Sequence, residues 1–413
     1  MVTLIINIAN LVGVCNKNEL LRGKKLAQLD AVAHAFILIE DGIIAQYGQM
    51  QQLSILVPHL PKHIVDATNQ TVLPAWCDSH THLVFAGSRE AEFVDKINGL
   101  SYAEIAAKGG GILNSAEKLQ EATEDELYHA ANKRLHALSK LGTGAIEIKS
   151  GYGLSVAAEL KMLRVIKRLK QQSEVSIKAT FLGAHTYPIQ FKDNHQGYID
   201  SIINDMLPVI AAESLADFID VFCENGFFSP QEMETICNAG KAHGLLPKLH
   251  INQLNSIGGL QKAVALQAVS VDHLETMTNN DVIDLSASNT IGTLLPTAAF
   301  FLRMPYQPAR TLIDHNCAIA LASDYNPGSS PSGNMNFVVA LSCIQMKMLP
   351  AEAINAATIN GAYAMQLQHK VGSITVGKNA NLIFTTPILS IAYLPYSFGT
   401  NLIESVMIKG VVV

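Results

Sequence analysis

The hydrophobic positions along the chain change character twice, from strand-like runs to a long alternating middle and back to strand-like runs. Residues 1–66 carry runs rich in β-branched residues, "TLIINIANLV" and "AFILIEDGIIAQYG". The dipeptide Asp41-Gly42 lies between two apolar stretches and is a strong signal for a two-residue hairpin turn. The last stretch, with "VGSITVGKNANLIF" and "SVMIKGVVV", has the same texture. We therefore expect a small β-sandwich domain formed by both termini, residues 1–66 plus 370–413.

The middle of the chain, residues 67–369, alternates between apolar β-rich runs and helical stretches. Strands that alternate with helices indicate parallel βα units, and eight such units favour a closed (β/α)8 TIM barrel of the α/β class. An open dinucleotide-binding sheet would need GxGxxG after its first strand, and that motif is absent there. Helices are expected at 116–140, 156–171, 230–243 and 258–266. The eight strand-like runs are 72–79, 143–149, 176–184, 217–223, 246–250, 269–273, 290–295 and 317–323.

The composition is sufficient for a large hydrophobic core, and the charge and the apolar runs argue against nucleic-acid and membrane partners. Of the 413 residues, 49% are hydrophobic and 15% are charged, which argues against disorder. The net charge is −6 and the basic residues are scattered, so no nucleic-acid partner is expected. No apolar run reaches the roughly 18 residues of a membrane-spanning helix, so no membrane partner is expected either.

The cysteines and the N-terminus bear on the compartment. None of the six cysteines forms a CxxC pair, so we expect reduced thiols and a cytoplasmic location. Residues 1–15 are apolar enough to be considered as a signal peptide. They lack a basic n-region, however, and Asn7 and Asn10 interrupt them, which favours a buried strand.

Polar residues gather where the eight runs end. In a (β/α)8 barrel the active site lies at the carboxyl ends of the strands, so these residues should share one mouth. The strand-end residues include His80, His82, the stretch 147–153, His185, Glu224, His250, His273 and Asp324.

Four of these side chains are candidate metal ligands. His80 and His82 are two residues apart, so on a strand both point to the same face. A bare HxH pair often arises by chance, but this one follows a buried run and shares the expected mouth with His250 and Asp324. Three imidazoles and a carboxylate suit Zn²⁺ or Fe²⁺ with a position left for an activated water. Asp324 could be a ligand, the proton acceptor for that water, or both.

Other residues at the expected mouth have two interpretations each. His273 could polarise a carbonyl or shuttle a proton, or it could be a core histidine bonded to backbone. Arg89, in the first loop, could hold a substrate carboxylate through two hydrogen bonds, although a lone arginine is more often a surface charge. The stretches "GGGI" at 109–112 and "PGSSPSG" at 327–333 could cradle an anion or be flexible loops, and substrate contact is favoured for the second only.

These motifs resemble the amidohydrolase superfamily over nearly the whole chain. "LPAWCDSHTHL" is similar to its first-strand HxH signature, and "ASDYNPGS" to its strand-eight aspartate. "ATINGAYAMQLQHKVGSITVGKNANLIF" is similar to the segment that leaves the barrel for the small β domain. Six ordered blocks resemble the imidazolonepropionase family: "DSHTHLVFAGSRE", "EIKSGYGL", "FLGAHTYP", "LHINQLNSIGG", "DHLE" and "ASDYNPGSSPSGNM".

This resemblance implies metal-dependent hydrolysis of the ring amide C–N bond of 4-imidazolone-5-propanoate to N-formimidoyl-L-glutamate, in histidine degradation. It implies that the catalytic groups are Asp324, His273 and His185, with His273 stabilising an oxyanion or moving a proton. Related barrels often pair, so a homodimer with a small-molecule substrate is expected. The implied ligands of one zinc or iron ion per subunit are His80, His82, His250 and Asp324. The implied substrate contacts are Arg89 to the propionate, Tyr152, His185 and Gln253 to the ring, and Asn326, Gly328 and Ser329 along the pocket.

Two departures from related patterns matter. Many deaminases of the superfamily carry HxxE after the fifth strand, but the residue three positions after His250 is Gln253, which cannot be a general base. Proton transfer then belongs to Asp324 or His273, or Gln253 only orients the ring. The fourth run, "FIDVFCENG", offers no lysine for carboxylation, and Lys149 on the second run is not an obvious substitute, so one metal is expected.

Two other functions would fit part of this pattern. A deaminase-type amidohydrolase acting on another cyclic amide or amidine is disfavoured by the missing acid and by Arg89, which suits an acidic substrate. A catalytically inactive scaffold would have lost metal ligands, and all four candidates are present.

Overall fold

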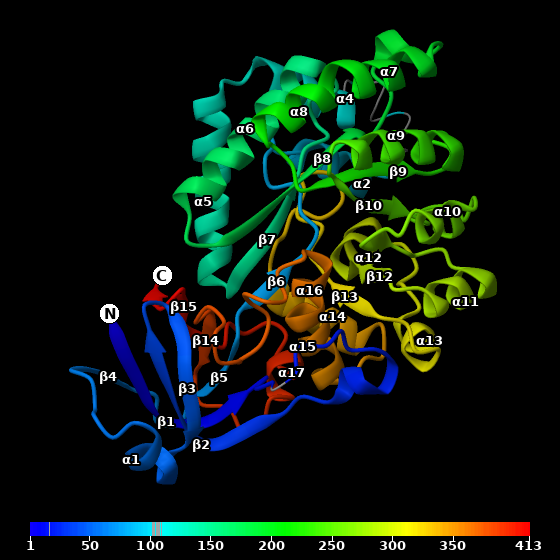
Figure 1. The fold of residues 1–413 in the computed structure, drawn as a ribbon. Coiled ribbons are helices and arrows are strands. Elements are labelled where there is room, and N and C mark those ends of the chain that lie inside the picture. Colours follow the sequence, from blue (N-terminus) through cyan, green and yellow to red (C-terminus); the bar gives the residue numbers. More distant parts are fainter. Residues whose placement is uncertain (16, 101–103, 105–107, 109) are drawn as a thin grey trace.

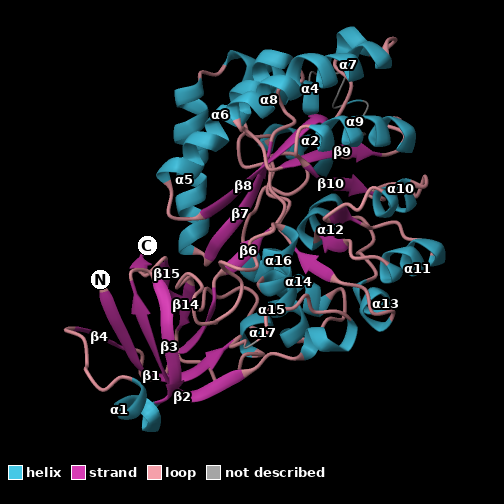
Figure 2. Cartoon of the chain, in the orientation of Figure 1, coloured by secondary structure: helices cyan, strands magenta, loops and turns pink. Residues whose placement is uncertain are grey.

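Two eight-stranded sheets organise the chain in the computed structural model, which describes residues 1–15, 17–100, 104, 108 and 110–413 (Figure 1). One sheet is parallel and is surrounded by helices, and the other takes strands from both ends of the chain (Figure 2). The expected (β/α)8 barrel with a small β domain from both termini is therefore confirmed. The boundaries of that domain, 1–66 plus 370–413 against 67–369, stay a prediction.

The sheet from the two termini is one continuous hydrogen-bonded sheet rather than two separate ones. Its strand order is β16-β15-β14-β5-β1-β2-β3, and β4 pairs with β1. The predicted hairpin is present, because β2 and β3 are antiparallel and both turn residues, Asp41 and Gly42, have positive φ angles of 48° and 80°. The strands are β1 (Val2–Val12), β2 (Ala31–Glu40), β3 (Ile43–Gln49), β4 (His63–Asp66), β5 (Thr71–Pro74), β14 (Leu382–Thr385), β15 (Ile403–Ile408) and β16 (Val411–Val412).

The barrel sheet runs from β6 to β13 in chain order, and its neighbouring strands are parallel. Just beyond β6 and β13 the chain closes the barrel, where Thr81 and Tyr325 form a parallel bridge. The N–H of Asp324 also donates to the His80 carbonyl at 3.0 Å, so the closure joins two candidate metal ligands. The strands are β6 (Trp76–Asp78), β7 (Thr143–Lys149), β8 (Ser176–Ala184), β9 (Phe218–Cys223), β10 (Leu246–Ile251), β11 (Ser270–His273), β12 (Ile291–Leu294) and β13 (Ile319–Leu321).

The first strand-like run was predicted wrongly as a single strand. Residues 72–79 contain the end of β5 and the whole of β6, and the two strands belong to different sheets. Pro74 has no N–H to continue the ladder, and the N–H of Ala75 donates to the Asn381 carbonyl at 2.9 Å. The chain thus passes from the terminal sheet into the barrel within one residue.

Helices form the outer layer of the barrel in Figures 1 and 2. No helix among the described residues is long and apolar enough to cross a membrane. Short 3₁₀ turns at Gly23–Ala27, Met50–Gln52 and Ile189–Phe191 and a π turn at Ile202–Met206 complete the chain. The helices are α1 (Leu53–Leu56), α2 (Glu90–Ile97), α4 (Ile112–Glu121), α5 (Glu124–Lys140), α6 (Val156–Gln172), α7 (His195–Ser201), α8 (Leu207–Glu213), α9 (Pro230–Ala242), α10 (Gly259–Ala265), α11 (Asn279–Ala287), α12 (Pro296–Leu302), α13 (Ala309–Asp314), α14 (Met335–Ile344), α15 (Pro350–Ala357), α16 (Ile359–Ala364) and α17 (Tyr393–Tyr396).

The helix expected over 116–140 is two helices, α4 and α5. The break lies at Thr123, which caps the start of α5 with a reciprocal pair of hydrogen bonds. Its hydroxyl accepts the N–H of Glu126 at 3.2 Å, and the Glu126 carboxylate accepts the N–H of Thr123 at 2.8 Å. The hydrophobic periodicity continues through the break, so periodicity alone did not reveal it, whereas the cap sequence could have done so.

We expect Thr123→Ala to lower the free energy of unfolding by about 1 kcal/mol, because it removes this cap. Urea unfolding followed by circular dichroism would measure the change. Thr235→Ala, the same substitution in the exposed middle of α9, is the matched control and should change stability by less than about 0.5 kcal/mol. Equal effects of the two variants would contradict the capping role.

Candidate metal centre and active site

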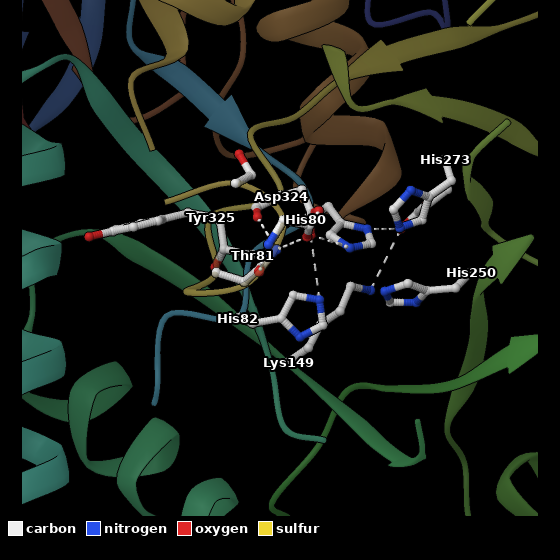
Figure 3. A network of polar contacts seen from close by, with 12 residues as sticks. His80, Thr81, His82, Lys149, His250, His273, Asp324 and Tyr325 are labelled. Atoms are coloured by element: carbon white, nitrogen blue, oxygen red, sulfur yellow. Dashed lines mark hydrogen bonds and ion pairs between the residues drawn. The ribbon is translucent and has the colours of Figure 1, made fainter. Parts of the chain in front are cut away.

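Five predicted side chains meet at the carboxyl end of the barrel (Figure 3). His80 and His82 follow β6, His250 lies near the end of β10, His273 ends β11, and Asp324 follows β13. None of the five is more than 2% exposed. One ligand atom from each of His80, His82 and His250 lies within 4.8 Å of the others, and the same holds for His80, His273 and Asp324. The predicted convergence of these residues is therefore present.

The spacing and the unsatisfied atoms of this cluster suit a cation. Asp324 Oδ1 lies 3.4 Å from His80 Nε2 and 3.6 Å from His82 Nε2. Within the described part of the chain, the buried Nε2 atoms of His80 and His250 have no hydrogen-bond partner. Buried polar atoms are seldom left unpaired because each one costs free energy. Imidazole nitrogens and a carboxylate oxygen are ligands that Zn²⁺ and Fe²⁺ accept, so the residues present fit such an ion.

The three histidines are held in the neutral form that a metal ligand needs. Burial lowers the pKa values of His80, His82 and His250 well below the usual histidine value. Lys149 and the neighbouring imidazoles add to that effect. A neutral imidazole keeps one unprotonated nitrogen, and this nitrogen is the one that binds a metal.

Two carboxylates select which nitrogen is free. His80 Nδ1–H donates to Asp272 Oδ2 at 2.7 Å, and His250 Nδ1–H donates to Asp220 Oδ2 at 2.8 Å. In each neutral ring the lone pair is then on Nε2, which faces the cluster. Sequence analysis missed both aspartates. The available signal was an acidic residue inside each of two otherwise apolar strand-like runs.

A buried ionic network supports these two aspartates from below. Lys149 Nζ lies 2.8 Å from Asp220 and 2.7 Å from Glu147. Lys248 Nζ lies 3.1 Å from Glu147 and 3.3 Å from Asp272. All five side chains are fully buried, so the opposite charges compensate one another in a region that water does not reach. Lys149 is therefore paired with acids, and the expectation of a single metal ion without a carboxylated lysine stays a prediction.

His273 and Asp324 combine an unusual backbone with shifted pKa values. Their φ angles are 88° and 52°, in the left-handed region that non-glycine residues adopt mainly where the surroundings hold them. Burial would lower the pKa of His273, but Glu275, with Asp324 and Asp272, holds that pKa above the usual value. Burial raises the pKa of Asp324 to about 6, against the opposing effects of His273 and of the hydrogen bond from Ser329. These two side chains are therefore the candidates at the mouth for accepting and donating a proton.

Tyr152 and His185 line the mouth beside the cluster. The His82 ring centroid lies 5.8 Å from that of Tyr152 and 5.5 Å from that of His185. Burial lowers the pKa of His185 to about 4, so the ring is neutral at pH 7. His185 Nδ1 is 3.0 Å from the Gly151 carbonyl, which can only accept, so Nδ1 carries the proton. His185 Nε2 then carries a lone pair that can accept a hydrogen bond.

One donor of Arg89 has no acceptor among the described residues, although Arg89 Nε lies 3.8 Å from Glu92 Oε1. It lies immediately before α2, and its Nε donates to Ser115 Oγ at 2.9 Å. Its Nη2 is buried and has no hydrogen-bond partner among the described residues. A β-carbon on Gly328 would lie 2.5 Å from Arg89 Nη1, so the glycine leaves room for the guanidinium. Arg89 and Gly328, distant in sequence, are thus brought together.

The remaining predicted contacts lie on two loops. The Asn326 side chain bonds within its own loop, because its Oδ1 accepts the N–H groups of Gly328 and Ser329, both at 2.8 Å. Ser329 Oγ donates to Asp324 Oδ2 at 3.0 Å, so this hydroxyl contacts a candidate ligand directly. Gln253 is half-buried, and its amide forms no hydrogen bond within the described part of the chain. Gly109 of the "GGGI" stretch lies outside the described residues.

Glu224, the strand-end residue after β9, anchors the loop that carries Gln253. Its Oε2 accepts the N–H of Leu254 at 2.8 Å and that of Asn255 at 3.2 Å. The Asn255 amide donates to Glu224 Oε1 at 3.0 Å. This strand-end acid therefore holds backbone and does not join the cluster of histidines.

Comparisons with known proteins agree with this geometry. The model of the amidohydrolase family matches residues 71–413. Imidazolonepropionase of Flavobacterium johnsoniae is 55% identical, with 100% of both chains covered. Imidazolonepropionase of Christiangramia forsetii is 52% identical, with 99% of each chain covered.

Solved structures show the same fold at low sequence identity. Guanine deaminase of E. coli superposes with a TM-score of 0.73 at 13% identity, over 100% of this chain and 99% of that one. Adenosine deaminase of Xanthomonas campestris, solved with bound zinc, gives a TM-score of 0.71 at 14% identity, over 99% of this chain and 92% of that one. At this identity the two deaminases bear on the architecture alone.

Proposed function

The chain belongs to the amidohydrolase family and, within it, to the imidazolonepropionases, and from this premise we propose which residues carry its reaction. The enzyme hydrolyses the ring amide C–N bond of 4-imidazolone-5-propanoate and yields N-formimidoyl-L-glutamate, a step of histidine degradation. One observation carries the assignment of the site. Three buried, neutral histidines and a carboxylate converge at the barrel mouth, next to an arginine whose buried Nη2 has no partner within the described chain.

We assign one metal ion per subunit, zinc or iron, to His80, His82, His250 and Asp324. Two hydrogen bonds support this assignment, one from His80 Nδ1–H to Asp272 and one from His250 Nδ1–H to Asp220. They leave the lone pair of each ring on Nε2, which faces the cluster. When bound, the ion supplies Lewis acidity, lowering the pKa of a water and polarising a carbonyl. A single ion is supported by β9, which offers no lysine for carboxylation.

The substrate roles follow from which polar atoms are free. Arg89 Nη2 would bind the propionate carboxylate, because a charge-assisted hydrogen bond satisfies a buried guanidinium well. His185 Nε2 would accept a hydrogen bond from a ring N–H, and the Tyr152 and Gln253 side chains would complete the ring contacts. Asn326, Gly328 and Ser329 would line the pocket, with Asn326 acting through the shape of its loop.

The proposed reaction needs one proton acceptor and one proton donor. Water adds to the ring carbonyl carbon, and Asp324 takes a proton from that water. His273, whose pKa is raised by its acidic neighbours, stabilises the oxygen that becomes negative and moves a proton. The C–N bond breaks, the departing ring nitrogen receives the proton, and the carbonyl carbon becomes the new carboxylate. Gln253 cannot accept a proton, so its role is to orient the ring.

Ultraviolet absorbance of freshly made 4-imidazolone-5-propanoate, mixed with metal-loaded protein, tests the function directly. We expect the imidazolone absorbance to disappear, N-formimidoyl-L-glutamate to form, and a chelator to abolish both. Metal added back to the chelated protein should restore turnover. If protein that is shown to contain metal leaves the substrate intact, the substrate assignment moves to a deaminase-type cyclic amide or amidine.

We also propose that the enzyme is a cytoplasmic homodimer. All six cysteines are free thiols, which supports a reducing compartment. Exposed aromatic and aliphatic side chains such as Leu389, Tyr396 and Phe398 on and beside α17 provide apolar surface that a second subunit could cover.

A further inference from the structure

A buried glutamate outside the cluster is not used by the proposed reaction. Glu159 lies in the first turn of α6 and is fully buried. No lysine or arginine in the described part of the chain forms an ion pair with it. An acid buried without a cation needs hydrogen-bond donors, so its partners indicate its task.

The partners of Glu159 are backbone N–H groups of one turn. Its Oε1 accepts from Gly153 at 2.7 Å and from Leu154 at 3.2 Å, and its Oε2 accepts from Gly151 at 3.1 Å. Burial raises the pKa of this carboxyl, and the bonds from Ser150 and from these amides oppose that rise. A single side chain thus satisfies three N–H groups of a buried turn that joins β7 to α6.

The turn is wrapped closely around the carboxylate. A β-carbon on Gly153 would lie 2.4 Å from the Glu159 amide nitrogen and 2.7 Å from Glu159 Oε1. Leu154 has a φ of 51°, a conformation that a leucine keeps only where its surroundings hold it. The backbone path from 150 to 154 therefore depends on the presence of an acceptor-only group at 159.

This turn carries one of the proposed substrate contacts and holds a second one by a hydrogen bond. Tyr152 lies at its centre, with its ring centroid 5.6 Å from that of His185. The Gly151 carbonyl, in the same turn, accepts the His185 Nδ1–H bond at 3.0 Å and so fixes which ring nitrogen is free. A shift of the turn would move the Tyr152 ring and, at the same time, break the hydrogen bond that orients His185.

We propose that Glu159 is a positioning residue for substrate binding: by accepting the N–H groups of the 150–154 turn, it sets the place of Tyr152 and the orientation of His185. This inference rests on the proposed contacts of those two residues with the imidazolone ring. Glu159 itself touches neither the metal ligands nor the substrate. Its effect is on KM, because it acts before the bond-breaking step.

The test replaces Glu159 by an isosteric group that is no longer acceptor-only. In Glu159→Gln the new NH₂ faces an N–H of the turn, so at least one of the three hydrogen bonds is lost. We expect KM for 4-imidazolone-5-propanoate to rise about tenfold or more, with metal stoichiometry unchanged, since small misplacement of binding groups weakens catalysis strongly. Glu352→Gln is the matched control. Glu352 is 3% exposed in the first turn of α15 and bonds to Leu349 and Arg310, so its variant should lose stability but keep KM.

A double-mutant cycle with Tyr152→Ala separates positioning from general destabilisation. If Glu159 acts through the turn, Glu159→Gln should raise KM less in the Tyr152→Ala background than in the wild type, because the Tyr152 contact is already gone and only the effect on His185 remains. Full additivity overturns the inference and leaves the proposed substrate contacts standing. Tyr152→Ala with an unchanged KM instead overturns the proposed contact of Tyr152.

A second variant serves if Glu159→Gln does not fold. Ser150→Ala removes one donor to the carboxylate, together with the hydroxyl that accepts the Leu182 N–H at 3.0 Å, and keeps the acid. It should raise KM by about threefold in the wild-type background and by less beside Tyr152→Ala, where only the effect on His185 remains. An unchanged KM in Ser150→Ala contradicts the positioning role.

Discussion

His80→Ala should leave a folded protein that contains less than about a tenth of one metal ion per subunit and has lost at least about 1,000-fold in kcat/KM. His80 is a central member of the cluster, because its Nε2 lies 3.4 Å from Asp324 and its Nδ1 is bonded to Asp272. Removing the ring deletes a metal ligand. It also removes the N–H that Asp272 Oδ2 accepts at 2.7 Å. Elemental analysis after dialysis against metal-free buffer measures the stoichiometry.

The same substitution on a helix surface provides the control. His136 lies on an exposed position of α5, so His136→Ala should bind metal and turn over substrate like the wild type. Thermal unfolding of the chelated proteins distinguishes lost metal binding from lost folding, since a metal that binds only the native state raises its stability. Full metal stoichiometry in His80→Ala would contradict the assignment of His80 as a metal ligand.

The barrel was predictable because its signal is long and regular. Seven of the expected runs coincide with single strands, to within a few residues at their ends, and most of those strands end at or next to a polar residue of the predicted site. The errors occurred where hydrogen bonding, not hydrophobicity, sets the boundary. At Pro74 a missing N–H ends one sheet, and at Thr123 a side-chain cap starts a new helix.

The site was predictable only for side chains at the ends of strands. Asp220 and Asp272 lie within or near the end of apolar runs and look like core positions until neighbouring strands bring them to the histidines. The role of Glu159 is harder to predict from the sequence, because acidic residues are common in helices. Its role depends on a turn whose N–H groups lie against the start of α6. These partners are set by three-dimensional register, which one sequence does not display.

Arg89→Ala should raise KM for 4-imidazolone-5-propanoate by about 10- to 100-fold, because a hydrogen bond to a charged group contributes about 1.5–3 kcal/mol. For an analogue with a propyl group in place of the propionate, the same variant should change KM less than about threefold. The contrast between the two substrates isolates the carboxylate contact from any general disturbance of the mouth.

Two further variants sharpen this argument about the buried guanidinium. Arg89→Lys keeps the charge but loses the fork of donors, so its KM for the acidic substrate should lie between those of the wild type and Arg89→Ala. Arg164→Ala removes a partly exposed arginine that pairs with Glu213, and it should leave KM for both substrates unchanged. Equal effects of Arg89→Ala on the acid and on its propyl analogue would remove Arg89 from carboxylate binding. The unpartnered Nη2 would then need another acceptor, since a buried guanidinium nitrogen without one is costly.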